Sequence, residues 1–231
     1  MDNQLRLNKF LAERLGVSRR EADDLIASGK VLVNGKPAIL GTRIDKNDKI
    51  LCNSKPVAFD NEFIYIAMNK PVGYVCSRRA QGDAPTLYDI LPAKFQKLKT
   101  VGRLDKDSSG LILLTNDGDF AFQMTHPKFH KEKTYLVELD RDLAPLHQQM
   151  ISDFGVDLDD GKSKFVVIRD ERFEDRKHFT VVLSEGRNRQ IRRTFQAVGY
   201  RVVKLHRTSF GKFNLGNLKP GATEEIPANM I

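Results

Sequence analysis

The sequence is poor in cysteine: among 231 residues only Cys52 and Cys76 carry a thiol. Two cysteines are too few for a framework of disulfide bonds, and their spacing differs from that of a thiolate zinc site. We therefore expect both to be buried or incidental thiols, and we exclude the class of small disulfide-stabilised domains.

Long apolar runs are also absent. No stretch approaches the roughly 18 apolar residues that a membrane-spanning helix requires. The N-terminal residues MDNQLRLNKF lack the basic and then apolar pattern of a secretory signal peptide. These absences predict a cytoplasmic protein that does not engage a membrane.

Several nucleotide and metal motifs are missing as well. The chain has no glycine-rich phosphate loop ending in Lys-Ser or Lys-Thr, no dinucleotide fingerprint and no HExxH segment. His126 and His130 have the spacing of two ligands on one helix, but Pro127 interrupts that helix and no acidic third ligand is evident. The sequence thus predicts no metal site.

Positive charge exceeds negative charge in this chain. Lysine and arginine outnumber aspartate and glutamate 38 to 30, which gives a net charge of +8 and a pI near 9.4. The summed field attracts polyanions, so nucleic acid is a candidate partner, although many basic proteins bind none. With 40% hydrophobic and 29% charged residues, the composition is that of a soluble globular protein. The length fits one ordinary domain with a small second one.

The N-terminal segment predicts two short helices. Residues 5–15 place apolar side chains on one helical face, at Leu7, Phe10, Leu11 and Leu15. Gly16 then ends this helix. Ser18 and Glu21 have the spacing of a capping box, in which each side chain satisfies a backbone amide, and they begin a second helix over residues 19–28.

Short strands are expected after these helices. The apolar residues 31–33 are followed by Asn34 and Gly35, a dipeptide that tolerates the positive φ angles of a tight hairpin turn. The N-terminal segment therefore has the order helix, helix, short strands.

Basic side chains crowd this small unit, at Arg6, Lys9, Arg19, Arg20, Lys30 and Lys36. Taken alone, such charge merely solvates a surface. The order RLNKFLAERLGVSRREADDLIASGKVLVNGK, however, closely resembles the S-four-type RNA-binding domain, which grips RNA with its paired helices and the following turn. The resemblance implies that RNA is contacted by Arg6, Lys9, Ser18, Arg19 and Arg20.

The remainder of the chain is expected to form a larger domain. Residues 1–51 make up the small unit, the polar residues 52–62 resemble a linker, and residues 63–231 follow. Strands are predicted at 63–68, 110–115, 134–139, 165–168, 179–183 and 202–205, and helices at 119–125, 143–153 and 188–198. Strands and helices do not alternate regularly, which favours an α+β domain with a mixed, largely antiparallel sheet.

Chemistry is expected at the segment VGRLDKDSSGL, a polar turn that leads into an apolar strand. An aspartate in such a turn usually bonds to nearby backbone amides and has only a structural role. The segment resembles, however, the GRLDxDSSG signature of the RsuA and RluA groups of pseudouridine synthases. That resemblance implies that Asp105 is catalytic.

Further segments resemble the same enzymes. Glu132-Lys133-Thr134-Tyr135 is similar to the element whose tyrosine packs against the target base, which implies this role for Tyr135; the alternative for Tyr135 is a core strand residue. In SEGRNRQIRR the arginine after Gln-Ile is similar to the one that pairs with the catalytic carboxylate, which implies that Arg192 keeps Asp105 ionised and oriented.

Other cations are expected to contact the substrate. The segment NKPVG, with Lys70, is similar to a motif that shapes the floor of the cleft, and Arg103 is similar to an arginine that fills the gap left by a flipped uridine; its alternative is a phosphate contact. From Ser184 to Lys212 there are eight lysines and arginines against one acid, Glu185. We expect Arg187, Arg189 and Arg193 of this stretch to bind phosphate, the alternative being a solvated helix face.

The whole pattern resembles the RsuA, RluB, RluE and RluF branch, whose substrates are ribosomal RNA or pre-ribosomal particles. The stretch RNRQIRRTFQAVGYRVVKLHRTSFG favours the large-subunit, RluB-like type, whereas the short chain is nearer to the small-subunit, RsuA-like type. We expect large-subunit RNA, with small-subunit RNA as the alternative. The resemblance implies a monomeric RNA pseudouridine synthase that needs no cofactor or metal. Two alternatives are a non-catalytic RNA-binding factor of ribosome assembly and an RNA hydrolase, for which no second acid or metal cluster stands out.

Overall fold

The computed structural model describes residues 4–59, 62–78 and 82–231. It divides the chain into two compact units, one formed by the described residues up to Ile64 with Asn116–Gly118, and one formed by Tyr65–Thr115 and Asp119–Ile231. Both units combine helices with strands, which confirms the α+β class. No helix in the described ranges is long and apolar enough to cross a membrane.

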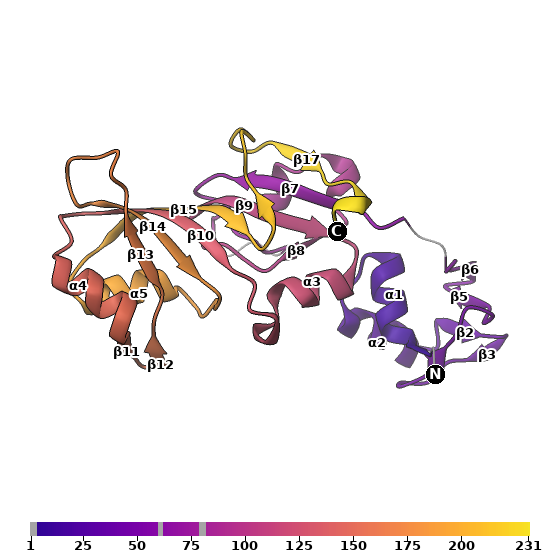
Figure 1. Cartoon of the computed structure of the whole chain (residues 1–231). Helices are drawn as coiled ribbons and strands as arrows, with labels where there is room; N and C mark the ends of the chain where they lie inside the picture. The colour runs from indigo at the N-terminus through magenta and orange to yellow at the C-terminus, as the bar shows by residue number, and fades with distance from the viewer. Residues whose placement is uncertain (1–3, 60–61, 79–81) are drawn as a thin grey trace. The chain divides into compact units, whose positions relative to one another are not determined.

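The first unit begins with a short strand and two helices (Figure 1). Its elements are β1 (Leu5–Arg6), α1 (Leu7–Leu15), α2 (Arg19–Ala27), β2 (Val31–Val33), β3 (Lys36–Pro37), β4 (Arg43–Ile44), β5 (Ile50–Cys52) and β6 (Lys55–Pro56). Helix α1 starts two residues later than expected because β1 pairs with β4. Gly16 ends α1 with a left-handed φ of 71°, and the capping box of Ser18 and Glu21 is confirmed.

The hairpins of this unit surround a small core. Asn34 and Gly35 have φ angles of 51° and 79°, so the expected turn between β2 and β3 is confirmed. The buried side chains that fill the core are Leu7, Phe10, Leu11, Ala12, Ala22, Ile26, Val31, Ala38, Ile44, Ile50 and Cys52. They come from both helices, from β2, β4 and β5, and, for Ala38, from the residue after β3, which fixes the helix pair against the strands.

The linker expected at residues 52–62 differs from the structure. Cys52 belongs to β5, and a turn with positive φ at Asn53 and Ser54 leads into β6, which pairs back onto β5. Val57 and Phe59 pack against the core. The expectation was wrong here because a short polar hairpin is held by backbone pairing and shows no apolar alternation; residues 60–61 lie outside the described residues.

The second unit contains one large sheet and a separate two-stranded sheet, β11 with β12. The strands of the whole unit are β7 (Tyr65–Lys70), β8 (Lys99–Val101), β9 (Ser109–Thr115), β10 (Lys133–Leu139), β11 (Val156–Leu158), β12 (Gly161–Ser163), β13 (Val166–Arg169), β14 (His178–Leu183), β15 (Val202–Phe210), β16 (Phe213–Asn214) and β17 (Thr223–Glu225). Its helices are η1 (Leu87–Asp89), η2 (Ala93–Phe95), α3 (Gly118–Thr125), η3 (Pro127–Phe129), α4 (Pro145–Gln149), η4 (Met150–Phe154), α5 (Gln190–Ala197) and η5 (Ala228–Met230).

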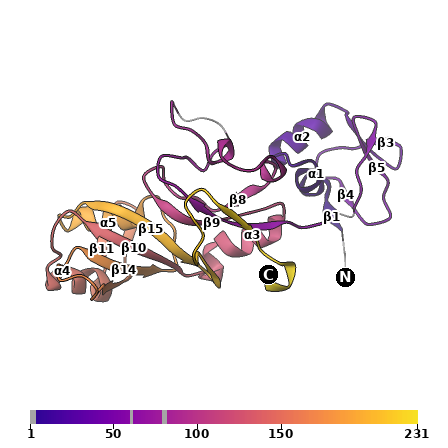
Figure 2. The ribbon, with the colours of Figure 1, turned by 90° about the horizontal axis from the view of Figure 1, so that it is seen from above.

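Nine strands form the large sheet, in the order β13-β14-β10-β15-β9-β7-β17, with β16 paired to β15 and β8 to β9. The pairs are antiparallel except β15 with β9, so the mixed, largely antiparallel sheet is confirmed. Helices α4 and α5 lie toward the β13–β14 end and α3 lies toward β8 and β9 (Figures 1 and 2). Strand β15 therefore connects the two halves of the sheet.

Gly110 is needed where β9 meets β15. It pairs with Arg207 and has a φ of 105°. A Cβ atom at this position would lie 2.2 Å from the carbonyl oxygen of Arg207, which is closer than any tolerated contact. The absence of a side chain thus lets the strand that follows the Asp105 turn lie directly beside β15.

Two elements of the second unit differ most from their expected ranges. Strand β15 runs on to Phe210, because Tyr135 and its neighbours on β10 continue to pair with it. The helix expected at 143–153 is instead the short α4 followed by a π-helical turn, η4. Pro145 fits the first turn of α4, where a proline costs no hydrogen bond.

Candidate active site

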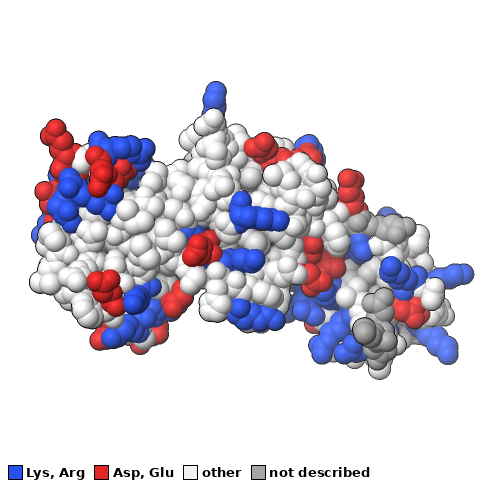
Figure 3. Space-filling view, viewed as in Figure 1, with Lys and Arg blue, Asp and Glu red and all other residues white. Residues whose placement is uncertain are grey.

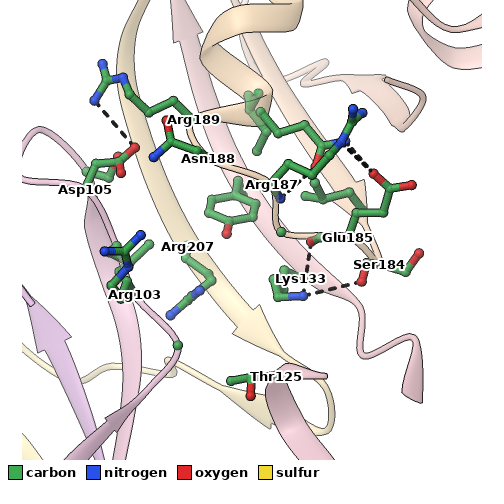
Figure 4. A pocket seen from close by; sticks show the side chains of 18 of the residues that line it. Arg103, Asp105, Thr125, Lys133, Ser184, Glu185, Arg187, Asn188, Arg189 and Arg207 are labelled. Atoms are coloured by element: carbon green, nitrogen blue, oxygen red, sulfur yellow. Dashed lines mark hydrogen bonds and ion pairs between the residues drawn. The ribbon is translucent and has the colours of Figure 1, made fainter. Parts of the chain in front are cut away.

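One cleft in the second unit brings together several of the expected site residues. It has a volume of ≈ 900 Å³ and is lined by the turn before β9, by β10, by the segment between β14 and α5, and by β15. Asp105, Tyr135, Arg187 and Arg189 all contribute to its walls. Figure 4 shows Asp105 and Arg189 at one side of the cleft and Lys133 with Glu185 at the other.

The turn that carries Asp105 is anchored by its own backbone. The Ser108 amide donates to the Asp105 carbonyl at 3.1 Å, and the Leu104 amide lies 3.4 Å from the Cys76 sulfur. Leu104 is buried, whereas the Asp105 side chain retains 32% of its exposure. The turn therefore holds the carboxylate at the cleft surface.

Lys70 was expected to contact the substrate, and the structure corrects this. Its side chain is fully buried, and its Nζ donates to the carbonyl oxygens of Ser108, at 2.6 Å, and Pro71, at 3.0 Å. Burial lowers the pKa of Lys70, while the nearby Cys76 and Asp105 oppose that shift. Lys70 therefore supports the Asp105 turn from inside the protein, since every residue of its strand β7 is buried.

The arginine that faces Asp105 is Arg189, not Arg192. The Arg189 Nη1 lies 3.5 Å from the Asp105 Oδ2, and its two terminal nitrogens donate to the Asp107 carboxylate at 3.0 and 2.9 Å. Arg189 immediately precedes α5 and has a left-handed backbone with φ 46°, a conformation that is uncommon outside glycine. That backbone turn, which no sequence motif indicated, directs the side chain toward the Asp105 turn.

Arg192 is nevertheless close to the same turn. Its Nε lies 3.3 Å from the Asp107 Oδ2, and its terminal nitrogens donate to the carbonyl oxygens of Asp107 and Val202, both at 2.8 Å. The hydrogen bond from Arg189 lowers the pKa of Asp107, and the charge of Arg192 adds to this. The expected pairing of Arg192 with Asp105 is thus replaced by a pairing with Asp107.

Arg187 and Arg193 were expected to be open to phosphate, but both bind Asp160. Its carboxylate accepts from Arg187 Nη1 at 3.0 Å and from Arg193 Nη2 at 2.7 Å. Arg187 also lies 3.2 Å from Glu185. Asp160 lies outside residues 184–212, in the turn between β11 and β12, and the fold brings its carboxylate to these arginines. On the face shown in Figure 3, basic and acidic side chains likewise lie next to one another.

Tyr135 and Arg103 both line the cleft. Tyr135 is buried in the middle of β10, between Arg207 of β15 and Val181 of β14, and it lines the cleft. Arg103 is exposed at the edge of the same cleft (Figure 4).

Two further cations, Lys133 and Arg207, line the cleft and were not predicted from the sequence as site residues. Lys133 donates from Nζ to the carbonyls of Lys131 at 3.0 Å and Glu185 at 3.1 Å. Burial, reinforced by the charge of Arg207, lowers its pKa to about 8. Arg207 is 2% exposed. The available signal was strand alternation, because Lys133 stands two residues before Tyr135 and therefore on the same face of β10.

In the first unit, the residues expected to contact RNA differ in how exposed their side chains are. Arg6, Arg19 and Arg20 are exposed and Lys9 is half-buried. Ser18 is instead engaged by the helix, since its hydroxyl accepts from the Glu21 amide at 3.1 Å. Its first role is therefore to cap α2.

The histidine pair considered for a metal lies on either side of η3. The His126 Nδ1 accepts from the Lys128 amide at 3.3 Å. In the residues that the structure describes, no group of three or more His, Cys, Asp or Glu side chains could hold a metal ion.

Comparisons with known proteins match both units. Residues 64–197 match the family model of RNA pseudouridylate synthases, and residues 5–50 match that of the S4 domain. The chain is 35% identical to the ribosomal large subunit pseudouridine synthase B of Bacillus subtilis (strain 168), over 98% of its own length and 93% of that protein. It is 37% identical to the ribosomal small subunit pseudouridine synthase A of Pasteurella multocida (strain Pm70), over 98% of both. A crystal structure of a pseudouridylate synthase aligns with a TM-score of 0.69 and 34% identity, over 98% of this chain and 97% of the other.

Proposed function

Since the chain belongs to the RNA pseudouridylate synthase family and carries an S4 domain, we propose that it converts a uridine of ribosomal RNA into pseudouridine with Asp105 as the essential carboxylate. One observation carries the proposal. Asp105, the aspartate of the family signature, lines the large cleft of the second unit with its side chain part-exposed.

The reaction requires a carboxylate and an enclosed space. The bond between N1 and C1′ breaks, the base turns, and C5 bonds to C1′, with no net redox change or hydrolysis. Asp105 can attack the sugar carbon, attack the base or remove a sugar proton. In each case the detached base must be retained and water excluded, which a partly closed cleft favours.

Neighbouring residues have supporting roles in this proposal. Tyr135 packs against the target base and replaces part of the stacking lost when the base leaves the RNA helix. Arg103, at the cleft edge, fills the space that the uridine vacates or contacts its phosphate. Arg189 orients Asp105, and Arg192 supports Asp107 on the same turn.

The first unit supplies affinity and placement, while residues 63–231 carry the chemistry. Exposed Arg6, Arg19 and Arg20 would contact phosphates of the RNA, an interaction that depends on salt. Because the named relatives act on the large and on the small ribosomal subunit, either RNA can be the substrate. We expect the protein to act as a monomer in the cytoplasm.

Mapping pseudouridines in both ribosomal RNAs, from cells with and without this protein, tests activity and substrate together. We expect one site to lose its pseudouridine in the deletion strain and to regain it with the wild-type gene but not with Asp105→Asn. Unchanged pseudouridine maps, with a defect in ribosome assembly, would instead favour a non-catalytic RNA-binding factor.

A further inference from the structure

Two cations of the cleft, Arg207 and Lys133, differ from the arginines around Asp105. Arg187, Arg189 and Arg193 each bind a carboxylate. In the described parts of the chain, neither Arg207 nor Lys133 forms an ion pair with a carboxylate. Both lie over the ring of Phe210, with Arg207 Cζ 5.0 Å and Lys133 Nζ 5.1 Å from its centroid.

One nitrogen of the Arg207 guanidinium forms a hydrogen bond, whereas another has no hydrogen-bond partner among the described residues. Its Nε donates to the Leu111 carbonyl at 2.7 Å, which fixes the guanidinium between β15 and β9. Its Nη2 is buried and has no hydrogen-bond partner among the described residues. A buried, unpaired cation is costly unless an anion or acceptor binds it, so this nitrogen marks a place for a ligand.

The side chain that carries this donor lines the cleft. Arg207 is one of the lining residues, and Figure 4 shows its guanidinium between Arg103 and Lys133. Arg207 also pairs across the strands with Tyr135, which we propose to pack against the target base. A base that contacts Tyr135 would therefore lie beside the free Nη2.

Each route open to Asp105 leaves negative charge on this base. If the carboxylate attacks C1′, an ester forms and the N1–C1′ electron pair stays on uracil. If the carboxylate removes the C2′ proton, a C1′–C2′ double bond forms and uracil again leaves as an anion. If it adds to C6, the electron pair of the C5–C6 bond moves to O4.

The charge is transient in all three routes. It spreads over the carbonyl oxygens of the base until C5 bonds to C1′ and the carboxylate is released or returns its proton to C2′. The proton that leaves C5 is balanced by the proton that N1 gains. Fixed donors that face developing charge in a closed site lower such barriers without having to reorganise.

We infer that Arg207 binds a carbonyl oxygen of the target base and stabilises the negative charge that forms there, and that Lys133 reinforces this positive site. The inference rests on the proposed function and adds a catalytic residue to it. Arg207 gains and loses no proton in this role. Arg207 stabilises the target base, whereas Arg189 orients the Asp105 carboxylate.

A backbone phosphate is the other anion that these cations could bind, and a binding experiment separates the two. 5-Nitrouracil is a uracil that is ionised at neutral pH, while uracil itself is neutral. Calorimetric titration should show the full chain binding 5-nitrouracil more tightly than uracil, and Arg207→Gln should abolish the difference. Competition by inorganic phosphate with no preference for 5-nitrouracil would overturn the inference.

A kinetic experiment tests the role in the reaction. Tritium release from ribosomal RNA labelled at C5 of uridine, measured at saturating enzyme, should fall roughly 10²–10³-fold in Arg207→Gln, the range for removal of one donor to developing charge. RNA affinity should change little. Arg207→Lys, which keeps the charge, should retain part of the rate.

Arg169→Lys is the matched control. Arg169 lies in β13 of the same sheet, donates to backbone carbonyls and has an unpartnered Nε, but it does not line the cleft. The Arg169→Lys variant should release tritium at the wild-type rate. An Arg207→Gln protein that folds and reacts like wild type would refute the inference, whereas an inactive wild-type protein would refute the proposed function instead.

Discussion

The Arg189 guanidinium lies 3.5 Å from the Asp105 carboxylate while it holds the Asp107 carboxylate with two hydrogen bonds. One planar side chain thus connects two acids of the same turn. A lysine offers no such fork, because its ammonium acts as a point charge.

Asp105→Asn should abolish turnover and leave folding and RNA affinity unchanged, because the amide keeps the shape and removes the charge. Tritium release and filter binding on the same ribosomal RNA measure the two properties. Asp157→Asn, at an exposed position of β11, is the control and should retain full activity. Substantial turnover by Asp105→Asn would exclude the proposed mechanism.

Arg189→Lys should lower the single-turnover rate at saturating enzyme by about tenfold or more, since Asp105 loses its facing guanidinium and Asp107 loses a bidentate partner. Binding should weaken much less. The opposite pattern, a lower affinity with an unchanged rate, would return Arg189 to the role of a phosphate contact.

Asp160→Asn should strengthen RNA binding. The substitution removes the carboxylate that occupies Arg187 and Arg193, and each arginine that then contacts phosphate should steepen the slope of log affinity against log salt by about one unit. Binding isotherms over a range of salt concentrations measure this slope. If binding weakens instead, Asp160 arranges the two arginines for RNA.

Gly110→Ala should destabilise the second unit by about 3 kcal/mol or more, because overpacking and a strained positive φ act together. Urea unfolding measures the change. Gly216→Ala is the matched control, since Gly216 also has a positive φ, of 56°, but nothing lies within 4 Å of its added Cβ. Equal decreases in the free energy of unfolding of the two variants would mean that the close contact with the Arg207 backbone does not contribute to the destabilisation.

Lys133 should make stability depend on pH. Its pKa is lowered to about 8 from 10.5, so between these values the unfolded chain holds a proton that the folded chain has lost. The free energy of unfolding of the wild type should therefore rise with pH across that window relative to Lys133→Met. Urea unfolding at several pH values tests this, and a constant difference would contradict it.

Features set by neighbouring residues were predicted correctly from the sequence. The Ser18 capping box and the Asn34-Gly35 turn depend on neighbouring residues only, and both are present as expected. The Asp105 turn was located from its motif and lies in the cleft.

Interactions between distant segments could not be predicted. The partner of Asp105 depends on the left-handed backbone of Arg189, and the partner of Arg187 and Arg193 comes from the β11–β12 turn. In the sequence, Arg207 cannot be distinguished from other basic residues of strands. Its burial and its unpaired nitrogen depend on how the strands pack.

Strand β15 also sets the order in which the cleft can be assembled during synthesis. Asp105 precedes β9, and Tyr135 lies on β10, yet these strands are separated in the sheet by β15, which is made much later. Until Val202–Phe210 has been synthesised, β9 and β10 cannot be joined into one sheet, and Asp105 and Tyr135 remain on separate parts of the nascent chain. Long-range pairing of this kind folds slowly, so we expect the cleft to be completed only after most of the chain has been translated.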